Sequence, residues 1–452
     1  MTHATPHLLR NIQLDDKFAP GPTRVYLTGI DALVRLPLLQ HEIDTAAGLK
    51  TGGFISGYRG SPLGGLDQSL WAAKKYLESH HITFNPGINE ELAATSVWGS
   101  QQLGIVSDSN YDGVFGMWYG KGPGVDRSMD VIKHANAFGT SPYGGVLAVA
   151  GDDHACKSST LPHQSEHMFM GASVPVLAPS NVQEVLDFGI YGWAMSRFSG
   201  CWVALKAITD NMDAAMGVEI DPARYSITLP PKEAISPDGM HARWPDPPLD
   251  QEKRLNLYKI YAARLFASIN GLNRIVMDSV KPALGIITSG KAYLDVMEAL
   301  GSLGIDDQTA NDLGIRVLKI GMPWPLDPEI IQVFSRGLTE ILVVEEKRSV
   351  IEDQLTSQLY NLAGESRPKI YGEFDHRGES LLPNTGELDP DLVARAMIAR
   401  LEALGISLRT KTSVAVASQG LCIDTPTRTP HFCSGCPHNT STKVPEGCVA
   451  MG

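Results

Sequence analysis

The sequence predicts an α/β protein in which a doubly wound parallel sheet is followed by a smaller α/β domain. From Val25 onward, short apolar segments alternate with helical patterns, which is the order expected of strands and helices in a parallel sheet. A Pro-rich polar stretch, Pro222–Leu249, interrupts this alternation, and a second alternating series follows it. A chain of 452 residues is also too long for one core, so two or three domains are expected.

The first series supplies helices and strands in turn. Helical patterns predict helices over Ala32–Ile43, Asp67–Glu78, Leu92–Leu103, Asp126–Ala137 and Ser180–Ser196. Short apolar runs predict strands over Gly53–Ser56, Gly113–Tyr119, Gly145–Ala150 and Gly200–Ala207. Their order predicts one parallel sheet with helices on both faces.

The second series begins with a helix over Gln251–Asn270. Strands are expected over Ala283–Thr288, Arg316–Ile320 and Glu340–Glu345, and helices over Ala292–Leu300, Pro328–Ser335 and Asp391–Leu404. Residues 406–429 are polar and irregular. We therefore expect a first domain over residues 1–235, a linker and helix over 236–275, a second domain over 276–405 and a final segment over 406–452.

Composition excludes several classes of protein. The net charge of -12 and the lack of a basic run argue against a general nucleic-acid binder. Met1–Arg10 lacks the pattern of a signal peptide, and no stretch offers the ~20 apolar residues of a membrane span, so a cytoplasmic protein is expected. Four of the six cysteines crowd the C-terminal end, which suits metal or redox chemistry better than a disulfide framework.

Glycines gather where two predicted strands end. Gly57 and Gly60, with Ser61, form a turn that can bring backbone amides and a hydroxyl close to a ligand, and the ends of parallel strands are where such sheets bind ligands. This turn lacks the spacing of dinucleotide-binding and P-loop motifs, so nicotinamide and ATP are disfavoured. The run after the next strand could form a second close-approach loop, with a solvated turn as the alternative; its glycines are Gly120, Gly122 and Gly124.

Glu90 stands at the start of an Ala-rich apolar helix, directly after a loop with a glycine. That setting suits a glutamate that stays ionised beside an apolar cavity and shares a proton in a hydrogen bond. Thiamine diphosphate enzymes need such a group, because a glutamate bonded to the aminopyrimidine ring promotes deprotonation of the thiazolium. An acidic residue at a helix N-terminus also complements the helix dipole without any cofactor, so only the surroundings of Glu90 can decide.

Two further segments concentrate possible metal ligands. The segment from Gly151 to His167 holds three histidines, but its spacing matches no zinc-protease motif, so a substrate-facing loop with hydrogen-bonded histidines is the preferred interpretation. Cys433 and Cys436 form a Cys-x-x-Cys pair with spacing typical of zinc or iron-sulfur sites. A second pair at similar spacing is missing, so a zinc module, a cluster and two unliganded thiols all stay open.

Taken in order, these segments resemble indolepyruvate:ferredoxin oxidoreductase, particularly its long fused bacterial form, within the thiamine-diphosphate-dependent 2-oxoacid:ferredoxin oxidoreductase superfamily. The resemblance covers nearly the whole chain. It rests on the segments YLTGIDALVRLPL, GYRGSPLGGLD, NEELAA, GDDHACKSS, VPVLAPSNVQEVLD, ITSGKAYLDVMEAL, ILVVEEKRSVIEDQL and FCSGCPHNTST.

The resemblance implies a role for each site residue. The first domain would be the pyrimidine-binding half of the cofactor site, with Glu90 as the aminopyrimidine glutamate and Ser61 facing substrate and cofactor. The second would be a transketolase C-terminal-like domain of mainly structural importance. Cys433 and Cys436 match cysteines that help to ligate a [4Fe-4S] cluster in relatives, although Ser434 replaces the Pro of many such motifs.

The family's reaction is oxidative decarboxylation of an aryl 2-oxoacid to an acyl-CoA, with coenzyme A and ferredoxin as partners. The diphosphate and Mg²⁺ are normally held by a Gly-Asp-Gly segment, and none follows His438. We therefore expect an N-terminal portion of the enzyme that works as a homo-oligomer or with the missing C-terminal part. The alternative is a catalytically incomplete fragment that folds and associates with other subunits.

Overall fold

The computed structural model describes residues 13–19, 23–105, 109–157, 159, 161–363, 367–408, 438–441 and 443–448. The chain divides into two units, Met1–Thr410 and Lys411–Gly452. The second unit contributes the short helix α16, His438–Ser441. All other elements belong to the first unit.

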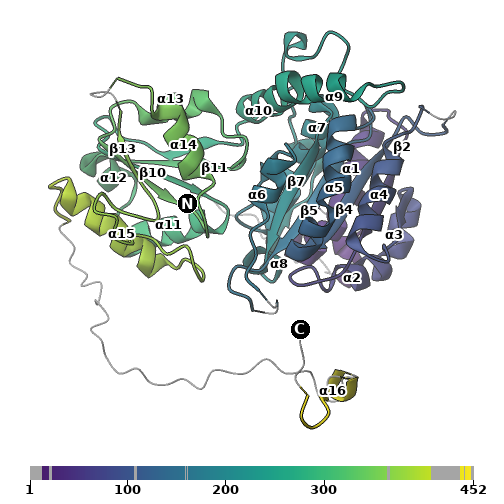
Figure 1. The fold of residues 1–452 in the computed structure, drawn as a ribbon, viewed down its shortest axis with the longest axis horizontal. Helices are drawn as coiled ribbons and strands as arrows, with labels where there is room; N and C mark the ends of the chain where they lie inside the picture. The colour runs from purple at the N-terminus through teal and green to yellow at the C-terminus, as the bar shows by residue number, and fades with distance from the viewer. Residues whose placement is uncertain are drawn as a thin grey trace, which may run out of the picture. The chain divides into compact units, whose positions relative to one another are not determined.

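A six-stranded, entirely parallel sheet lies at the centre of the first part of the chain (Figure 1). Its strand order is β3-β2-β4-β5-β7-β6. The strands are β2 (Thr51–Gly57), β3 (Ile82–Phe84), β4 (Gly113–Lys121), β5 (Val146–Asp152), β6 (Val176–Leu177) and β7 (Trp202–Ile208). This arrangement confirms the α/β class and the parallel sheet predicted from the sequence.

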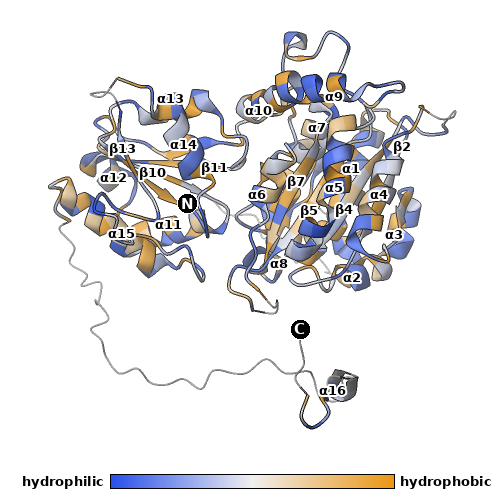
Figure 2. Ribbon diagram, in the orientation of Figure 1, coloured by the Kyte–Doolittle hydropathy of each residue, from blue (hydrophilic) through white to orange (hydrophobic). Residues whose placement is uncertain are grey.

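Helices cover both faces of this sheet, so it is doubly wound as predicted. One face carries α1 (Gly29–Ala46), α2 (Leu66–Ala72), α3 (Lys74–Ser79) and α7 (Val182–Ser199). The other carries α4 (Glu90–Ser100), α5 (Gly122–Phe138) and α6 (Glu166–Gly171). Successive residues of β4 point to opposite faces, and Trp118 packs under α4 and α5 while Tyr119 packs on the side of α1 and α2. Because both faces are covered, β4 and β5 are buried along nearly their whole length. The strands β5 and β7 are also mostly hydrophobic (Figure 2).

The winding of this sheet reverses between β2 and β4. From β2 the chain moves outward to β3, and it then returns to place β4 on the other side of β2. Connections that leave neighbouring strands in opposite directions open a crevice at the carboxyl ends of those strands, which is where doubly wound sheets bind ligands. The glycine-rich segments predicted from the sequence follow these two strands.

Several smaller elements flank the sheet. A two-stranded antiparallel ribbon joins β1 (Arg24–Thr28) to β8 (Ala215–Glu219). The remaining short elements are η1 (Leu14–Lys17), α8 (Thr209–Met212), η2 (Pro222–Arg224) and η3 (Lys232–Ala234). The predicted helix Gln251–Asn270 is present as α9 (Pro248–Arg254), a π-helical turn (Leu255–Lys259) and α10 (Ile260–Ile269).

The smaller α/β domain has a five-stranded sheet of order β13-β12-β10-β11-β9, in which β9 alone is antiparallel to its neighbour. Its strands are β9 (Arg274–Met277), β10 (Leu284–Ser289), β11 (Ile315–Ile320), β12 (Glu340–Val344) and β13 (Lys369–Tyr371). Its helices are α11 (Lys291–Ser302), α12 (Asp307–Leu313), α13 (Pro328–Ser335), α14 (Ile351–Leu359) and α15 (Pro390–Ala403).

Some predicted elements differ from the structure. The single helix predicted over Asp67–Glu78 is two helices that meet at Ala73, where the backbone N–H bonds to Ser69 O and Trp71 O. The strands β3 and β6 were not predicted, because runs of three and two residues carry too little periodicity to be recognised. The domain boundaries stay a prediction.

Candidate active site

Glu90 is the first residue of α4, but it does not serve as the cap of this helix. That position belongs to Asn89, whose side chain accepts a hydrogen bond of 2.9 Å from Leu92 N. Glu90 is 8% exposed, and its carbonyl oxygen accepts a hydrogen bond of 2.9 Å from Trp118 Nε1. Within the described residues its carboxylate forms no hydrogen bond or ion pair. The backbone of Glu90 is thus fixed while its buried carboxylate stays available to a ligand.

Two of the predicted glycines lie directly against the Glu90 side chain. A Cβ atom on Gly124 would stand 2.5 Å from Glu90 Cγ and 2.7 Å from its Oε1. A Cβ on Gly120 would stand 3.2 Å from Glu90 Cγ and 2.9 Å from the ring of Trp118. The carboxylate therefore occupies space that exists only because these positions lack side chains.

The turn after β2 approaches the same place. Gly57 ends β2, and a Cβ there would stand 2.3 Å from Tyr119 O of the neighbouring strand. Gly60 faces the side chain of Lys121, whose Cδ would be 2.7 Å from an added Cβ. Ser61 follows, partly buried, in the turn whose Leu63 N–H donates to Gly60 O at 2.7 Å. The structure thus brings the two glycine-rich segments together at the ends of β2 and β4.

The second glycine-rich segment is not the loop that its composition suggested. Gly120 and Lys121 complete β4, and α5 begins at the next residue, Gly122. The reason for glycine here is close packing: a Cβ on Gly122 would lie 2.1 Å from the ring of His163. The first turn of α5 is therefore held between the His163 ring and the Glu90 side chain.

His163 is the charged residue on the outer side of this turn. Its Nε2 lies 2.9 Å from Asp126 Oδ2, and its Nδ1 lies 3.5 Å from Asp152 Oδ1. The ion pair with Asp152, followed by the hydrogen bond with Asp126, raises the pKa of His163 to about 9 against the opposing effect of burial. Burial opposes ionisation of Asp152, but its ion pair with His163 and the nearby charge of Lys206 lower its pKa to about 2.

Replacing Asp126 by Asn is expected to lower the pKa of His163 by about one unit, because one of two anionic partners is lost. A raised histidine pKa stabilises the fold fully below the unfolded value of about 6.5, and this contribution is lost as the pH rises through 9. Between pH 6.5 and pH 9, the free energy of unfolding of the Asp126→Asn variant should therefore fall less than that of the wild type. NMR titration of His163 and unfolding curves across this range measure both effects; an unchanged titration midpoint would contradict the pairing.

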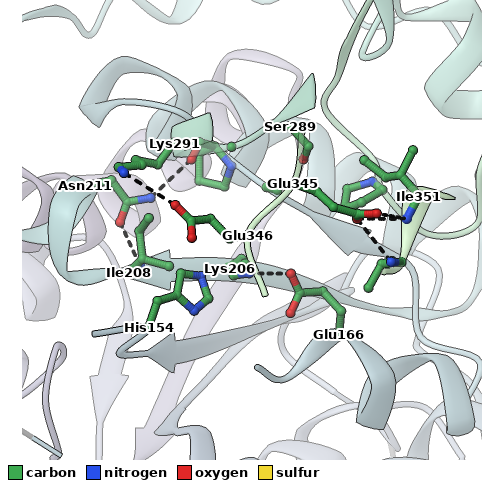
Figure 3. Close-up of a pocket in the computed structure, with 15 residues that line it drawn as sticks. His154, Glu166, Lys206, Ile208, Asn211, Ser289, Lys291, Glu345, Glu346 and Ile351 are labelled. Carbon is green, nitrogen blue, oxygen red and sulfur yellow. Dashed lines mark hydrogen bonds and ion pairs between the residues drawn. The ribbon is translucent and has the colours of Figure 1, made fainter. Parts of the chain in front are cut away.

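A second charged cluster joins the ends of β5 and β7 to the strand ends of the smaller domain (Figure 3). Lys206 forms an ion pair with Glu166, and across the cavity Lys291 lies 3.4 Å from Glu346 Oε1. The cavity has a volume of about 30 Å³, which admits about one water molecule. Each of these ion pairs lies within one domain, and the cavity between them is too small to be a substrate pocket.

The predicted histidine loop is hydrogen-bonded rather than open for a metal. His154 Nδ1 lies 3.1 Å from His163 O, and burial with the nearby charge of Lys206 lowers the pKa of His154 to about 3. In the described part of the chain no group of three or more His, Cys, Asp or Glu side chains could hold a metal ion. The predicted ligands Cys433 and Cys436 lie outside the described residues. Among the helices that are described, none has the length and apolarity needed to cross a membrane.

Sequence reasoning missed two residues that build the site. Trp118 holds the Glu90 backbone, and Tyr119 donates a hydrogen bond of 2.5 Å to Asp67 beneath the turn. His163 belongs to the histidine segment singled out from the sequence, but its contact with α5 was not predicted. The alternation of residues along β4 could have indicated that Trp118 and Tyr119 face opposite helices. No sequence signal pairs His163 with Asp126, since 37 residues separate them.

Comparison with known proteins confirms the resemblance predicted from the sequence. Residues 274–418 match the family model of the indolepyruvate oxidoreductase domain. The indolepyruvate oxidoreductase subunit IorA of Methanothermobacter marburgensis is 27% identical over 89% of this chain and 59% of its own length. The IorA subunit of Pyrococcus abyssi is 25% identical over 95% of this chain and 60% of its own. The chain thus spans about three-fifths of the length of these relatives.

A solved structure shares the fold. The 2-oxoglutarate:ferredoxin oxidoreductase of Magnetococcus marinus, solved with 2-oxoglutarate, coenzyme A and succinyl-CoA bound, superimposes with a TM-score of 0.60. The match covers 89% of this chain and 68% of that protein at 14% sequence identity. At this identity the comparison establishes a shared architecture.

Proposed function

Starting from its relationship to the indolepyruvate oxidoreductases, we propose that this chain supplies the pyrimidine-binding part of a thiamine-diphosphate-dependent 2-oxoacid:ferredoxin oxidoreductase. The complete enzyme decarboxylates an aryl 2-oxoacid oxidatively, passes electrons to ferredoxin and forms an acyl-CoA. The observation that supports the proposal is the Glu90 carboxylate, which is buried against Gly120 at the end of β4 and Gly124 at the start of α5.

The site fits a flat heterocycle that bears a proton on a ring nitrogen. A buried carboxylate without a protein partner is costly, and a hydrogen bond from the ring would offset that cost. The glycines leave backbone instead of side chains around the carboxylate, so a planar ring can approach it. Thiamine diphosphate, when bound, supplies the thiazolium that stabilises negative charge on the substrate carbon.

This chain's residues would act on the proton rather than on the substrate carbon. Glu90 would hold the proton shared with the aminopyrimidine, and the bond from Trp118 to its carbonyl would keep the start of α4 in place. Ser61 and the turn that begins at Gly57 would border the substrate. Because α4 and α5 cover this side of the sheet, the carboxylate is shielded from bulk water, which strengthens its hydrogen bond.

We propose that the diphosphate, Mg²⁺ and the redox centre are bound outside the described residues. Cys433 and Cys436 would contribute to a [4Fe-4S] cluster, and another stretch of protein would hold the diphosphate. Calorimetry should then show tight binding of thiamine diphosphate and Mg²⁺ to the complete assembly and weak binding to this chain alone. Metal analysis of the purified assembly should find iron and sulfide rather than zinc.

The function is tested by reduction of a redox dye by the complete assembly. Indolepyruvate or phenylpyruvate, with coenzyme A and thiamine diphosphate, is expected to support reduction, and omission of thiamine diphosphate from the stripped enzyme should abolish it. Branched 2-oxoacids in the same assay measure substrate preference. If none of these 2-oxoacids raises the rate above that without substrate, the proposed reaction is wrong.

A further inference from the structure

A groove beside the candidate active site combines cations with an apolar wall. It has a volume of about 480 Å³, within the range of small-molecule sites, and lies between residues 161–168 and two segments of the smaller domain, 347–348 and 384–386. Leu161, Pro162 and Met168 supply the apolar wall. His163, Lys347 and Arg348 supply three cations, and the carboxylate of Asp126 is already bonded to His163.

Lys347 is the most unusual of these cations. It is 8% exposed, and within the described residues no carboxylate lies within 4.0 Å of its ammonium group. Its Nζ donates a hydrogen bond of 2.5 Å to Gly386 O, while Glu346 and Glu387 act on it only at longer range. Burial lowers the pKa of Lys347, and the more distant carboxylates of Glu346, Glu387 and Asp153 oppose this effect. An anion in the groove would stabilise a buried cation of this kind.

The backbone of this segment is also held in an uncommon conformation. Lys347 has a φ of +65°, in the left-handed region that residues other than glycine rarely adopt. The next residue, Arg348, is fixed by Gln164, whose side chain bonds to both Arg348 O (2.9 Å) and Arg348 N (3.3 Å). Strained residues that are held by their surroundings are characteristic of ligand sites.

Arg348 extends the positive charge from the buried end of the groove to its mouth. Its side chain is exposed, and its guanidinium forms no hydrogen bond or ion pair with any described residue. An anionic group that contacted Lys347 could therefore also be bound by Arg348, which offers paired donors suited to carboxylate and phosphate. The apolar wall would accept the uncharged part of the same ligand.

We propose that this groove binds an organic anion, with its charged group at Lys347 and Arg348 and its apolar part on Leu161, Pro162 and Met168. The inference deepens the proposed function, because the aryl 2-oxoacid carries a carboxylate and coenzyme A carries phosphates on an aliphatic chain. The groove lies beside the proposed cofactor site: His163, which lines the groove, packs on Gly122, and Glu90 packs on Gly124. The first turn of α5 therefore lies between the groove and the Glu90 carboxylate.

Direct binding to the full chain tests the groove without any need for turnover. Calorimetry at constant ionic strength would use two probes, inorganic pyrophosphate for the phosphate source and phenylpyruvate for the carboxylate source. The wild-type chain is expected to bind at least one of them, and the preferred probe identifies the source. Arg348→Gln and Lys347→Asn should each weaken that binding about tenfold or more, since each removes a charged donor. Asn tolerates the left-handed backbone of position 347, so this variant keeps the fold.

The matched control is Arg395→Gln, which removes an exposed arginine from α15, outside the groove, with the same change of charge. It should bind the preferred probe as tightly as the wild type does. The proposal is overturned if the wild-type chain binds neither probe, or if both groove variants bind as tightly as the control. If Glu90 variants kept full turnover, the proposed role of Glu90 on the cofactor would be contradicted. The measured binding of the anionic probe to the groove would be unaffected.

Discussion

Replacing Glu90 by Gln is expected to lower 2-oxoacid-dependent dye reduction by the complete assembly at least about a hundredfold. The amide has nearly the same shape as the carboxylate, so packing against Gly120 and Gly124 is preserved. It cannot, however, take up the proton that the carboxylate would share with the aminopyrimidine. The rate should fall while the affinity for the 2-oxoacid changes little, because Glu90 does not contact the substrate in this account.

Glu91→Gln provides the matched control for this experiment. Glu91 is the next residue of α4 and loses the same charge, but it is exposed and its nearest cation is Arg127 at 3.9 Å. An exposed ion pair of this length contributes little, so turnover and stability should both stay close to those of the wild type. If Glu90→Gln and Glu91→Gln lost turnover equally, the negative charge at the start of α4 would matter, and the particular position of the Glu90 carboxylate would not.

Replacing Gly124 by Ala is expected to reduce turnover about a hundredfold without a matching loss of stability. The new Cβ would stand 2.5 Å from Glu90 Cγ, so the glutamate side chain must move. A displacement of about 1 Å at a catalytic group can cost a factor of about one hundred in rate. Because the obstructing atoms belong to a flexible side chain and Ala favours the helix by about 1 kcal/mol over Gly, the melting temperature should change little.

Gly99→Ala is the control for this substitution. Gly99 lies within α4, and a Cβ there would meet no atom within 4 Å. This variant should be slightly more stable than the wild type and fully active. Thermal unfolding and dye reduction measured on both variants separate displacement of Glu90 from a general effect of alanine. If the Gly124→Ala enzyme were fully active, turnover would not depend on the exact position of the Glu90 carboxylate.

The architecture of the two sheets could be predicted because long apolar strands and periodic helices recur in order. The predicted helix Pro328–Ser335 coincides with α13, whose start is marked by the Asp327 cap and the first-turn proline. What could not be predicted was the pairing of short or exposed segments. The ribbon of β1 with β8 joins strands that are almost two hundred residues apart, and β8 is mostly exposed, so neither periodicity nor composition indicates it.

The candidate site could be predicted only in part, and its glycines show the physical reason for this limit. Clusters of glycine marked the ends of β2 and β4, and the sequence placed Glu90 at a helix start. The sequence suggested that Gly120, Gly122 and Gly124 formed either a close-approach loop or a solvated turn. The structure shows instead that they admit the Glu90 side chain, the Trp118 ring and the His163 ring. Glycine composition signals a close approach, but only the tertiary structure identifies the approaching group.

Hydrogen-deuterium exchange at carbon 2 of the thiazolium, followed by NMR in the complete assembly with bound thiamine diphosphate, tests the central role of Glu90 most directly. The wild-type assembly is expected to exchange this proton rapidly, because Glu90 assists its removal before any substrate binds. The Glu90→Gln assembly, loaded with the same cofactor, should exchange it at least about a hundredfold more slowly. Equal exchange rates in the two assemblies would contradict the assignment of Glu90 to the cofactor.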